Sequence, residues 1–130
     1  MQRLSPHLGL EKKLDLFFEN CGNQEAFQQE ALDRILDQAC QLAGATVVRT
    51  SWHEFPIPDW QINGITIVKI LAESHLVCHT YPLKEEGESI TVSISTCGEK
   101  TTPQAIVPFL TNSFKPQKTF VSKTNWEVAS

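Results

Sequence analysis

A cluster of polar and reactive side chains interrupts an apolar part of this 130-residue sequence. Residues 65–70 are apolar and mostly β-branched, which predicts a buried strand. The segment 73–79, Glu-Ser-His-Leu-Val-Cys-His, follows almost at once and has no evident packing use there. A second break, Thr-Cys-Gly at 96–98, closes a later strand-like segment. Because such breaks mark functional sites, we expect a hydroxyl, an imidazole and a thiol to lie within reach of one another.

A metal site is the first chemistry that these residues could support. His75 and His79 are four residues apart, with Cys78 between them. On a helix this spacing would put both imidazoles on one face, where they could bind zinc. The flanking residues are strand-like, however, and two strand side chains four residues apart are separated by roughly 13 Å. One zinc ion cannot bridge that gap, so we predict no metal.

A cysteine nucleophile is the second possibility. Cys97 could act as the thiolate, with His79 as its base and Glu73 as the residue that orients the base. The residue types fit, but the sequence has no oxyanion-hole signature and no local protease motif. This possibility therefore rests on residue types alone.

Self-cleavage is the third possibility, and it starts from the bond between Glu73 and Ser74. A serine hydroxyl can attack the carbonyl before it and turn the amide into an ester. Elimination of that ester leaves dehydroalanine, which hydrolyses to a pyruvoyl group at a new N-terminus. The chemistry needs a strained serine, a base for its Cα proton and hydroxyl partners that polarise the carbonyl. His79 and Thr66 can supply the base and a hydroxyl.

The elements that must position these residues are predicted by hydrophobic spacing. Apolar residues at helical spacing predict a helix over 24–43, with Asn23 as its N-cap and Gly44 at its end. A shorter helix is predicted over 103–114, with Pro103 in its first turn. Strands are predicted within 8–18, 45–53, 64–72, 76–81, 90–96 and 119–123.

This order of elements predicts an α+β fold, with one mainly antiparallel sheet and both helices on one of its faces. The length is that of a single domain over residues 1–130. The other face of the sheet also needs cover. A chain of this size can obtain that cover by packing sheet against sheet with a second copy.

Composition excludes several classes of protein. Hydrophobic residues make up 41% of the chain and charged residues 20%, as in an ordinary globular domain. The formal net charge of −4 argues against nucleic acid or an anionic membrane surface as the main partner. The sequence has no signal-peptide pattern and no apolar run of membrane-spanning length, so we expect a cytoplasmic protein. Its four cysteines lack Cys-x-x-Cys spacing and are expected to be reduced thiols.

Five sequence blocks resemble the proenzyme of bacterial and archaeal S-adenosylmethionine decarboxylase, in that family's order, from about residue 8 to 121. They are Gly-Ala-Thr at 44–46, Gly-Ile-Thr at 64–66, Leu-Ala-Glu-Ser-His-Leu at 71–76, His-Thr-Tyr-Pro at 79–82 and Thr-Cys-Gly at 96–98. The resemblance implies self-cleavage between Glu73 and Ser74, which gives a β chain (1–73) and an α chain (74–130) that begins with a pyruvoyl group. It also implies a homodimer of processed protomers, packed as an αββα sandwich, that acts on a small-molecule substrate.

The resemblance further implies roles for single residues. Ser74 becomes the pyruvoyl carbonyl, which forms a Schiff base with the substrate amine and accepts the electrons released with carbon dioxide. His79 matches the processing histidine that removes the serine Cα proton, and Cys97 matches the acid that protonates the substrate carbon. Thr66 stands where the family carries a small hydroxyl that assists processing. Phe55 lies in the loop that supplies an aromatic ring to stack on adenine.

Three positions depart from the family pattern. Leu83 replaces a glutamate that can bind the ribose hydroxyls, and Ser93 and Ser95 stand where an acidic residue and an aromatic are usual. A leucine cannot accept hydrogen bonds from the sugar, so the nucleoside pocket is expected to be altered. Glu85 or Glu86, in the longer loop that follows, could take over substrate binding.

Three functions remain open on the sequence. The first is pyruvoyl-dependent decarboxylation of S-adenosylmethionine, which gives the aminopropyl donor for spermidine synthesis. The second is decarboxylation of arginine or ornithine by the same machinery, with Glu85, Glu86 and Glu88 as candidates for binding the distal cation. The third is a relative without enzymatic activity that keeps the fold.

Overall fold

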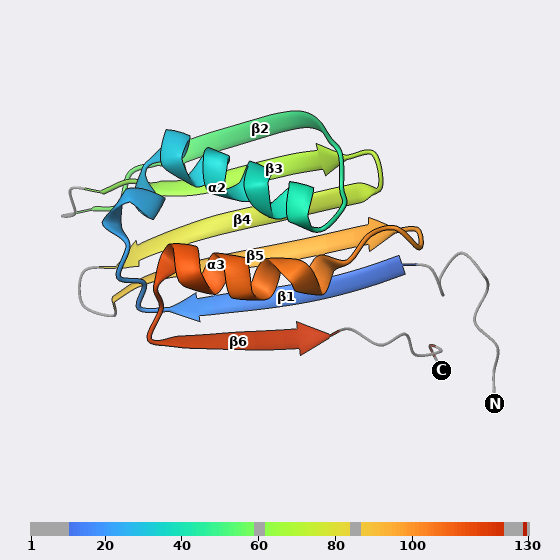
Figure 1. The fold of residues 1–130 in the computed structure, drawn as a ribbon. Helices are drawn as coiled ribbons and strands as arrows, with labels where there is room; N and C mark the ends of the chain where they lie inside the picture. Colours follow the sequence, from blue (N-terminus) through green and yellow to red (C-terminus); the bar gives the residue numbers. More distant parts are fainter. Residues whose placement is uncertain (1–10, 59–61, 84–86, 124–128, 130) are drawn as a thin grey trace.

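A computed structural model describes residues 11–58, 62–83, 87–123 and 129. They form one six-stranded sheet in the order β2-β3-β4-β5-β1-β6 (Figure 1), and every neighbouring pair of strands is antiparallel. The strands are β1 (Glu11–Glu19), β2 (Val47–Phe55), β3 (Gly64–Leu71), β4 (Ser74–Leu83), β5 (Gly87–Cys97) and β6 (Lys118–Lys123). The predicted antiparallel sheet is therefore confirmed.

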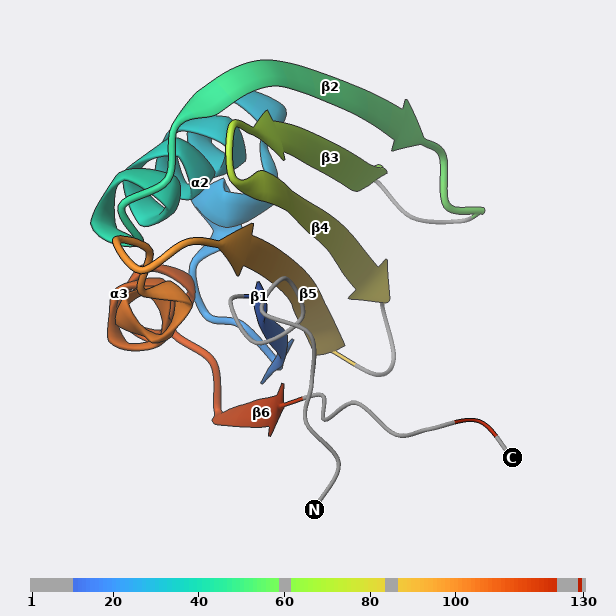
Figure 2. The ribbon, with the colours of Figure 1, turned by 90° about the vertical axis from the view of Figure 1, so that its right-hand side faces the viewer.

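Two helical segments cover one face of this sheet, as Figure 2 shows from the side. They are the 3₁₀ turn η1 (Gln24–Phe27) with α2 (Gln29–Leu42), and the 3₁₀ turn η2 (Pro103–Ala105) with α3 (Ile106–Phe114). The first differs from the single predicted helix because Gln28 is extended, at φ −102° and ψ 133°. This break lets Ala26 and Phe27 enter the core before α2 begins. Among the described helices, none combines the length and the apolar character needed to cross a membrane.

The hydrophobic core lies between the helices and the sheet. Alternate residues of the inner strands point into it, as Leu14, Leu16 and Phe18 do on β1. Helix α2 contributes Leu32 and Leu36, which are fully buried. Burying each such side chain stabilises the fold by about 1.5–3 kcal/mol. The core thus fixes the sheet on which the functional residues are carried.

A buried ion cluster ties α2 to the sheet. Lys69 of β3 is fully buried, and its ammonium group pairs with Asp33 and Asp37 of α2 and donates a hydrogen bond to Thr50 Oγ1 at 2.9 Å. Burial by itself lowers the pKa of Lys69, but the two carboxylates outweigh it and raise that pKa above its ordinary value. Lys69 therefore stays charged inside the fold and holds the helix in place.

The face of the sheet opposite the helices is called the outer face here. Among the described residues it carries no helix or strand (Figure 2). Large apolar side chains are exposed on it, with Phe17 38%, Ile70 45% and Phe120 50% exposed. Exposed aromatic and aliphatic groups gathered on one side of a sheet indicate an interaction surface. The sheet-to-sheet dimer stays a prediction.

Candidate active site

The turn between β3 and β4 carries the bond predicted to be cut. Ala72 and Glu73 form a two-residue turn, and Leu71 pairs with Ser74 across it. Ser74 has a φ of 152°. Residues other than glycine rarely adopt such a value, and it stores roughly 1–3 kcal/mol of backbone strain. The strained residue is thus the serine that the sequence identified as the nucleophile.

The carbonyl group of Glu73 is held by a backbone donor. It accepts a hydrogen bond from the Cys97 N–H at 2.9 Å. That N–H is directed at the carbonyl which the Ser74 hydroxyl would attack, so it can stabilise the negative charge that develops there. The Ser74 hydroxyl itself lies 3.1 Å from Nδ1 of His75. The structure therefore brings Glu73, Ser74 and Cys97 together and adds His75, which the sequence suggested only as a zinc ligand.

Thr96 also lies beside the predicted cleavage site. It is directly opposite Ser74 in the ladder between β4 and β5. Its Oγ1 atom is buried and has no hydrogen-bond partner among the described residues. An unpaired buried hydroxyl costs about 1–3 kcal/mol, and native structures keep few of them. This feature distinguishes the surroundings of Ser74 from those of an ordinary hairpin.

Thr66 and His79 form a second cluster, on the outer face of the sheet. They are paired across β3 and β4, and Thr66 Oγ1 lies 3.0 Å from Nδ1 of His79. His79 is five residues along β4 from Ser74, which is roughly 16 Å at the rise of a β-strand. Within one chain, the structure does not bring the predicted base next to the serine.

Phe55 belongs with this second cluster. It ends β2 and pairs with Gly64, the first residue of β3. Its ring lies directly over the glycine, because a Cβ added to Gly64 would be only 2.2 Å from two ring carbons. The Gly-Ile-Thr block therefore has a structural reason for its glycine. Phe55 is placed at the same end of the sheet as Thr66 and His79.

The four cysteines are free and differ in burial. Cys21, Cys40 and Cys78 are buried, and burial raises the pKa of the Cys21 thiol to about 12 and that of Cys40 to about 11. These three thiols stay protonated and act as small apolar groups. Cys97, at the end of β5, is only partly buried.

The alternative in which Cys97 and His79 act as nucleophile and base has no support from the geometry of one chain. His79 pairs with Thr91 near the start of β5, whereas Cys97 is the last residue of that strand. Cys97 is six residues along β5 from Thr91, which is roughly 20 Å at the rise of a β-strand. The structure therefore groups Cys97 with Ser74 and not with His79.

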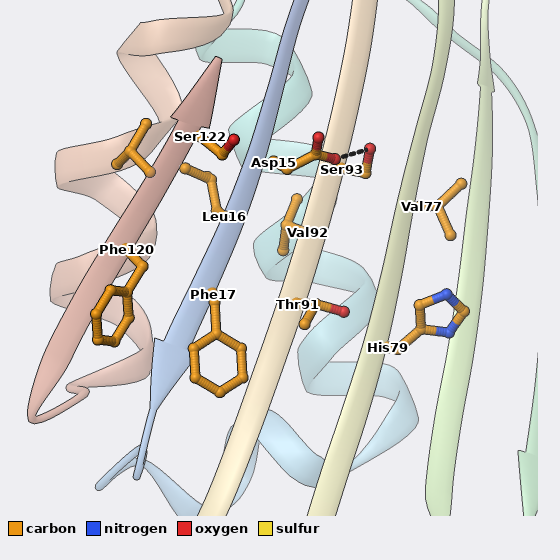
Figure 3. Close-up of a pocket in the computed structure, with 11 residues that line it drawn as sticks. Asp15, Leu16, Phe17, Val77, His79, Thr91, Val92, Ser93, Phe120 and Ser122 are labelled. Atoms are coloured by element: carbon orange, nitrogen blue, oxygen red, sulfur yellow. Dashed lines mark hydrogen bonds between the residues drawn. The ribbon is translucent and has the colours of Figure 1, made fainter. Parts of the chain in front are cut away.

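A pocket of about 370 Å³ lies on the outer face (Figure 3). The rings of Phe17 and Phe120 line one side of it, with centroids 5.9 Å apart, and the imidazole of His79 lies on the other side. The Asp15 carboxylate also lines the pocket and accepts a hydrogen bond from the Ser93 hydroxyl at 2.6 Å. The pocket thus combines two aromatic rings, an imidazole and a carboxylate.

The two serines that depart from the family pattern each hold a carboxylate of β1. Ser93 contacts Asp15, and the Ser95 hydroxyl donates a hydrogen bond to Oε1 of Glu11 at 3.1 Å. Neither acid was predicted from the sequence to be part of the site. The alternation of residues 14–18 could have found Asp15, because residues between buried strand positions face away from the helices.

The glutamates proposed for the loop after β4 have different outcomes. Glu85 and Glu86 lie outside the described residues, as does the side chain of Leu83. Glu88 is described, and its carboxylate accepts a hydrogen bond from Nε2 of Gln24 at 2.7 Å. The structure therefore directs Glu88 toward η1 rather than toward the pocket.

Comparisons with known proteins agree with the sequence blocks. The family model described as S-adenosylmethionine decarboxylase matches residues 15–125. A relative named S-adenosylmethionine decarboxylase proenzyme, from Methanococcus maripaludis, is 31% identical over 118 residues, which cover 91% of this chain and 85% of the relative. A protein of the same name from Pyrobaculum islandicum is 34% identical over 98 residues, which cover 75% and 73% of the two chains.

The fold agrees as well. The crystal structure of the adenosylmethionine decarboxylase from Aquifex aeolicus aligns with a TM-score of 0.72 and covers 93% of each chain. At 20% identity, this likeness supports the fold alone. The family model, in contrast, spans most of the sequence and includes Ser74, His79 and Cys97. The chain therefore belongs to the S-adenosylmethionine decarboxylase family.

Proposed function

We propose that this protein is a cytoplasmic, self-processing enzyme that decarboxylates S-adenosylmethionine and so supplies the aminopropyl donor for spermidine synthesis. One observation carries the proposal: Ser74 is strained, and the carbonyl before it is held by the Cys97 N–H. Membership of the family supports the choice of substrate.

The groups around the turn are suited to self-cleavage. Ser74 Oγ attacks the Glu73 carbonyl carbon and passes its proton to a base, for which His75 Nδ1 is at 3.1 Å. The peptide bond becomes an ester, while the Cys97 N–H stabilises the oxyanion. Loss of the Ser74 Cα proton then expels the Glu73 carboxylate. Addition of water at residue 74 releases ammonia and leaves a pyruvoyl group at the start of the α chain, 74–130.

The pyruvoyl group would supply a carbonyl that accepts electrons as the substrate loses carbon dioxide. Two observations fit its position. The buried Thr96 hydroxyl opposite residue 74 has no partner among the described residues, and Cys97, one residue further along β5, is only partly buried. We assign to Cys97 the protonation of the substrate carbon, because an acid is needed at that step.

A homodimer would complete this site. Ser74 and Cys97 lie at one end of the sheet, whereas Thr66, His79 and Phe55 lie toward the other. A two-fold axis across the outer face would place Thr66 and His79 of one protomer near the partner's Ser74. The symmetry would repeat the same contact in the opposite direction. The partner's His79 would then remove the Ser74 Cα proton. The exposed apolar groups of the outer face support this αββα arrangement.

Mass and activity measurements test the proposal together. The purified 14.6 kDa chain should appear as two fragments split before residue 74, and the α fragment should react with a hydrazine that traps carbonyl groups. The cleaved protein should release carbon dioxide from S-adenosylmethionine. A single intact species that resists carbonyl trapping would remove the proposal and favour a relative without enzymatic activity.

Decarboxylation of arginine or ornithine is the second candidate function. It is favoured by Asp15 in the pocket and by Leu83 in place of a glutamate that could bind ribose. A carboxylate on an otherwise aromatic wall can pair with the distal cation of a basic amino acid. Release of carbon dioxide from arginine or ornithine, with none from S-adenosylmethionine, would replace the first candidate.

A further inference from the structure

We propose that the Glu73 side chain holds the bond to be cut in its reactive conformation by binding the backbone N–H of Thr46. The inference rests on the proposed self-cleavage. It gives Glu73 a positioning role beyond its place before the cut, and it gives Thr46 a function that neither the sequence blocks nor the chemistry above had assigned.

Hydrogen bonds fix the turn from two sides. On the side of β5, the Cys97 N–H donates to the Glu73 carbonyl at 2.9 Å. On the side of β2, the Thr46 N–H donates to Oε1 of Glu73 at 2.8 Å. The Ala72 N–H in turn donates to the Thr46 carbonyl at 2.9 Å. The two bonds between Thr46 and the turn are called the turn clamp here.

The turn clamp gives a physical reason for the strain at Ser74. A φ of 152° persists only where the surroundings over-determine the backbone. Because Ala72 and Glu73 are anchored to one neighbouring segment and the Glu73 carbonyl to another, residue 74 has to take up the remaining rotation. Conversion of the peptide bond to an ester lets that strain relax. The clamp therefore raises the free energy of the precursor and so lowers the barrier to cleavage.

The same role explains the Gly-Ala-Thr block at 44–46. Gly44 follows α2 with a φ of 75°, and a Cβ at this position would lie 2.7 Å from the Lys100 carbonyl oxygen. Only glycine fits this turn, because of both its φ and the close backbone. The turn sends the chain toward β2 and delivers the Thr46 N–H to Glu73.

A matched pair of variants tests the clamp. Glu73→Gln keeps a side-chain oxygen that can accept from Thr46, whereas Glu73→Met has a similar length and no such acceptor. Freshly synthesised precursor is followed by gel as it splits into two fragments. We expect Glu73→Met to cleave about tenfold more slowly than wild type and Glu73→Gln to stay within about threefold of it, as loss or weakening of one hydrogen bond implies. Glu54→Ala, an exposed position on β2, serves as the control and should cleave at the wild-type rate.

Amide hydrogen exchange tests the contact without the reaction. In a Ser74→Ala chain, which cannot cleave, the Thr46 N–H should be protected. Adding Glu73→Met should speed its exchange. The Thr102 N–H, which donates to the Ala43 carbonyl at 2.8 Å, should stay protected in both proteins. This reference separates a lost clamp from a general loss of fold, which would expose both amides.

The outcomes are distinguishable. If Glu73→Met cleaves as fast as wild type, the clamp has no role in positioning and the inference fails while self-cleavage stands. If Glu73→Gln is as slow as Glu73→Met, the side-chain oxygen is not the acting group and the inference also fails. A wild-type chain that never splits overturns the proposed function itself, together with the clamp.

Discussion

Thr66 and His79 face each other across β3 and β4, with 3.0 Å between the threonine hydroxyl and Nδ1 of the imidazole. This pair lies five residues along β4 from Ser74. The hydroxyl–imidazole pair and the strained serine therefore occupy different parts of one sheet. The proposed two-fold dimer would bring them together.

Complementation between two inactive chains tests this arrangement. A Ser74→Ala chain has no nucleophile and a His79→Ala chain has no processing base, so each alone should stay intact. When the two are co-expressed with different tags, the His79→Ala chain should be cleaved, because the partner's His79 reaches its Ser74. Mass spectrometry of each tagged chain gives the result.

The control for this experiment pairs the His79→Ala chain with a Ser74→Ala/His79→Ala double variant. This mixture contains no imidazole at position 79 and should remain intact. Normal cleavage of the His79→Ala chain by itself would show that another base acts. His75, which lies 3.1 Å from the Ser74 hydroxyl, would then be the first to test.

Replacing Cys97 should separate self-cleavage from turnover. The Glu73 carbonyl is held by the backbone N–H of Cys97, which Cys97→Ala retains, so the variant should still split into two fragments. It lacks the thiol that we propose protonates the substrate, so kcat should fall by about 10²- to 10⁴-fold. Gel analysis measures cleavage, and carbon dioxide release per cleaved protomer measures turnover. Cys40→Ala, at a buried thiol, is the control and should keep its turnover.

A charge on the outer face should prevent both association and processing. Phe17 lines the pocket on that face and is 38% exposed, and Phe17→Glu would put an unpaired carboxylate into an apolar contact between sheets. We expect a monomer by light scattering, and an uncleaved chain by gel. Trp52→Glu is the control, because Trp52 is 52% exposed and pairs with Ile67, whose side chain lies on the helix side. A cleaved, dimeric Phe17→Glu protein would contradict the proposed interface.

Removing the two acids of the ion cluster should cost more stability than removing Lys69 itself. Replacing both Asp33 and Asp37 by asparagine leaves a buried ammonium group with only neutral hydrogen-bond partners, and should lower the free energy of unfolding by about 3–5 kcal/mol. Lys69→Met removes the buried charge and leaves partly exposed carboxylates, so it should cost much less. Urea denaturation of Ser74→Ala chains compares the variants without interference from cleavage. Equal losses would show that the buried charge does not set the cost.

The same cluster predicts a dependence of stability on alkaline pH. The two carboxylates raise the pKa of Lys69 in the folded state above its ordinary value of 10.5. The contribution of the cluster to stability is therefore complete below pH 10.5 and is lost as the pH rises through the folded value. Urea midpoints of the Ser74→Ala chain should fall in that range. The fall should be smaller when Lys69→Met is added, and identical curves would contradict the assignment.

Hydrophobic spacing predicted most of the fold because burial imposes a period on each element. The alternation of Leu14, Leu16 and Phe18 defines β1, and Gly44 ends α2 as predicted. The extended residue Gln28 escaped prediction, since a single change of backbone angle leaves no trace in that pattern. Strand ends were also displaced, because turn contacts rather than side-chain periodicity decide where pairing stops.

The site was predicted less completely than the fold. Family blocks identified Ser74 and Cys97. These two residues lie close together because the start of β4 pairs with the end of β5. The distance between Ser74 and His79 follows from the same strand rise that excludes zinc between His75 and His79, so their separation within one chain was predictable from the sequence. The bond between Thr46 and Glu73 could not be predicted, because it joins segments 27 residues apart through a contact that no periodicity encodes.

The order of strands in the sheet has a consequence for a chain cut before residue 74. One fragment would then contain β1 to β3 and the other β4 to β6. In the sheet, however, β1 lies between β5 and β6, and β3 lies beside β4. The two pieces are interleaved, so they stay together without a covalent link. Once denatured, however, they must find each other again by collision, and recovery would depend on concentration. Cleavage would thus change refolding of the sheet from a unimolecular process into an association of two fragments.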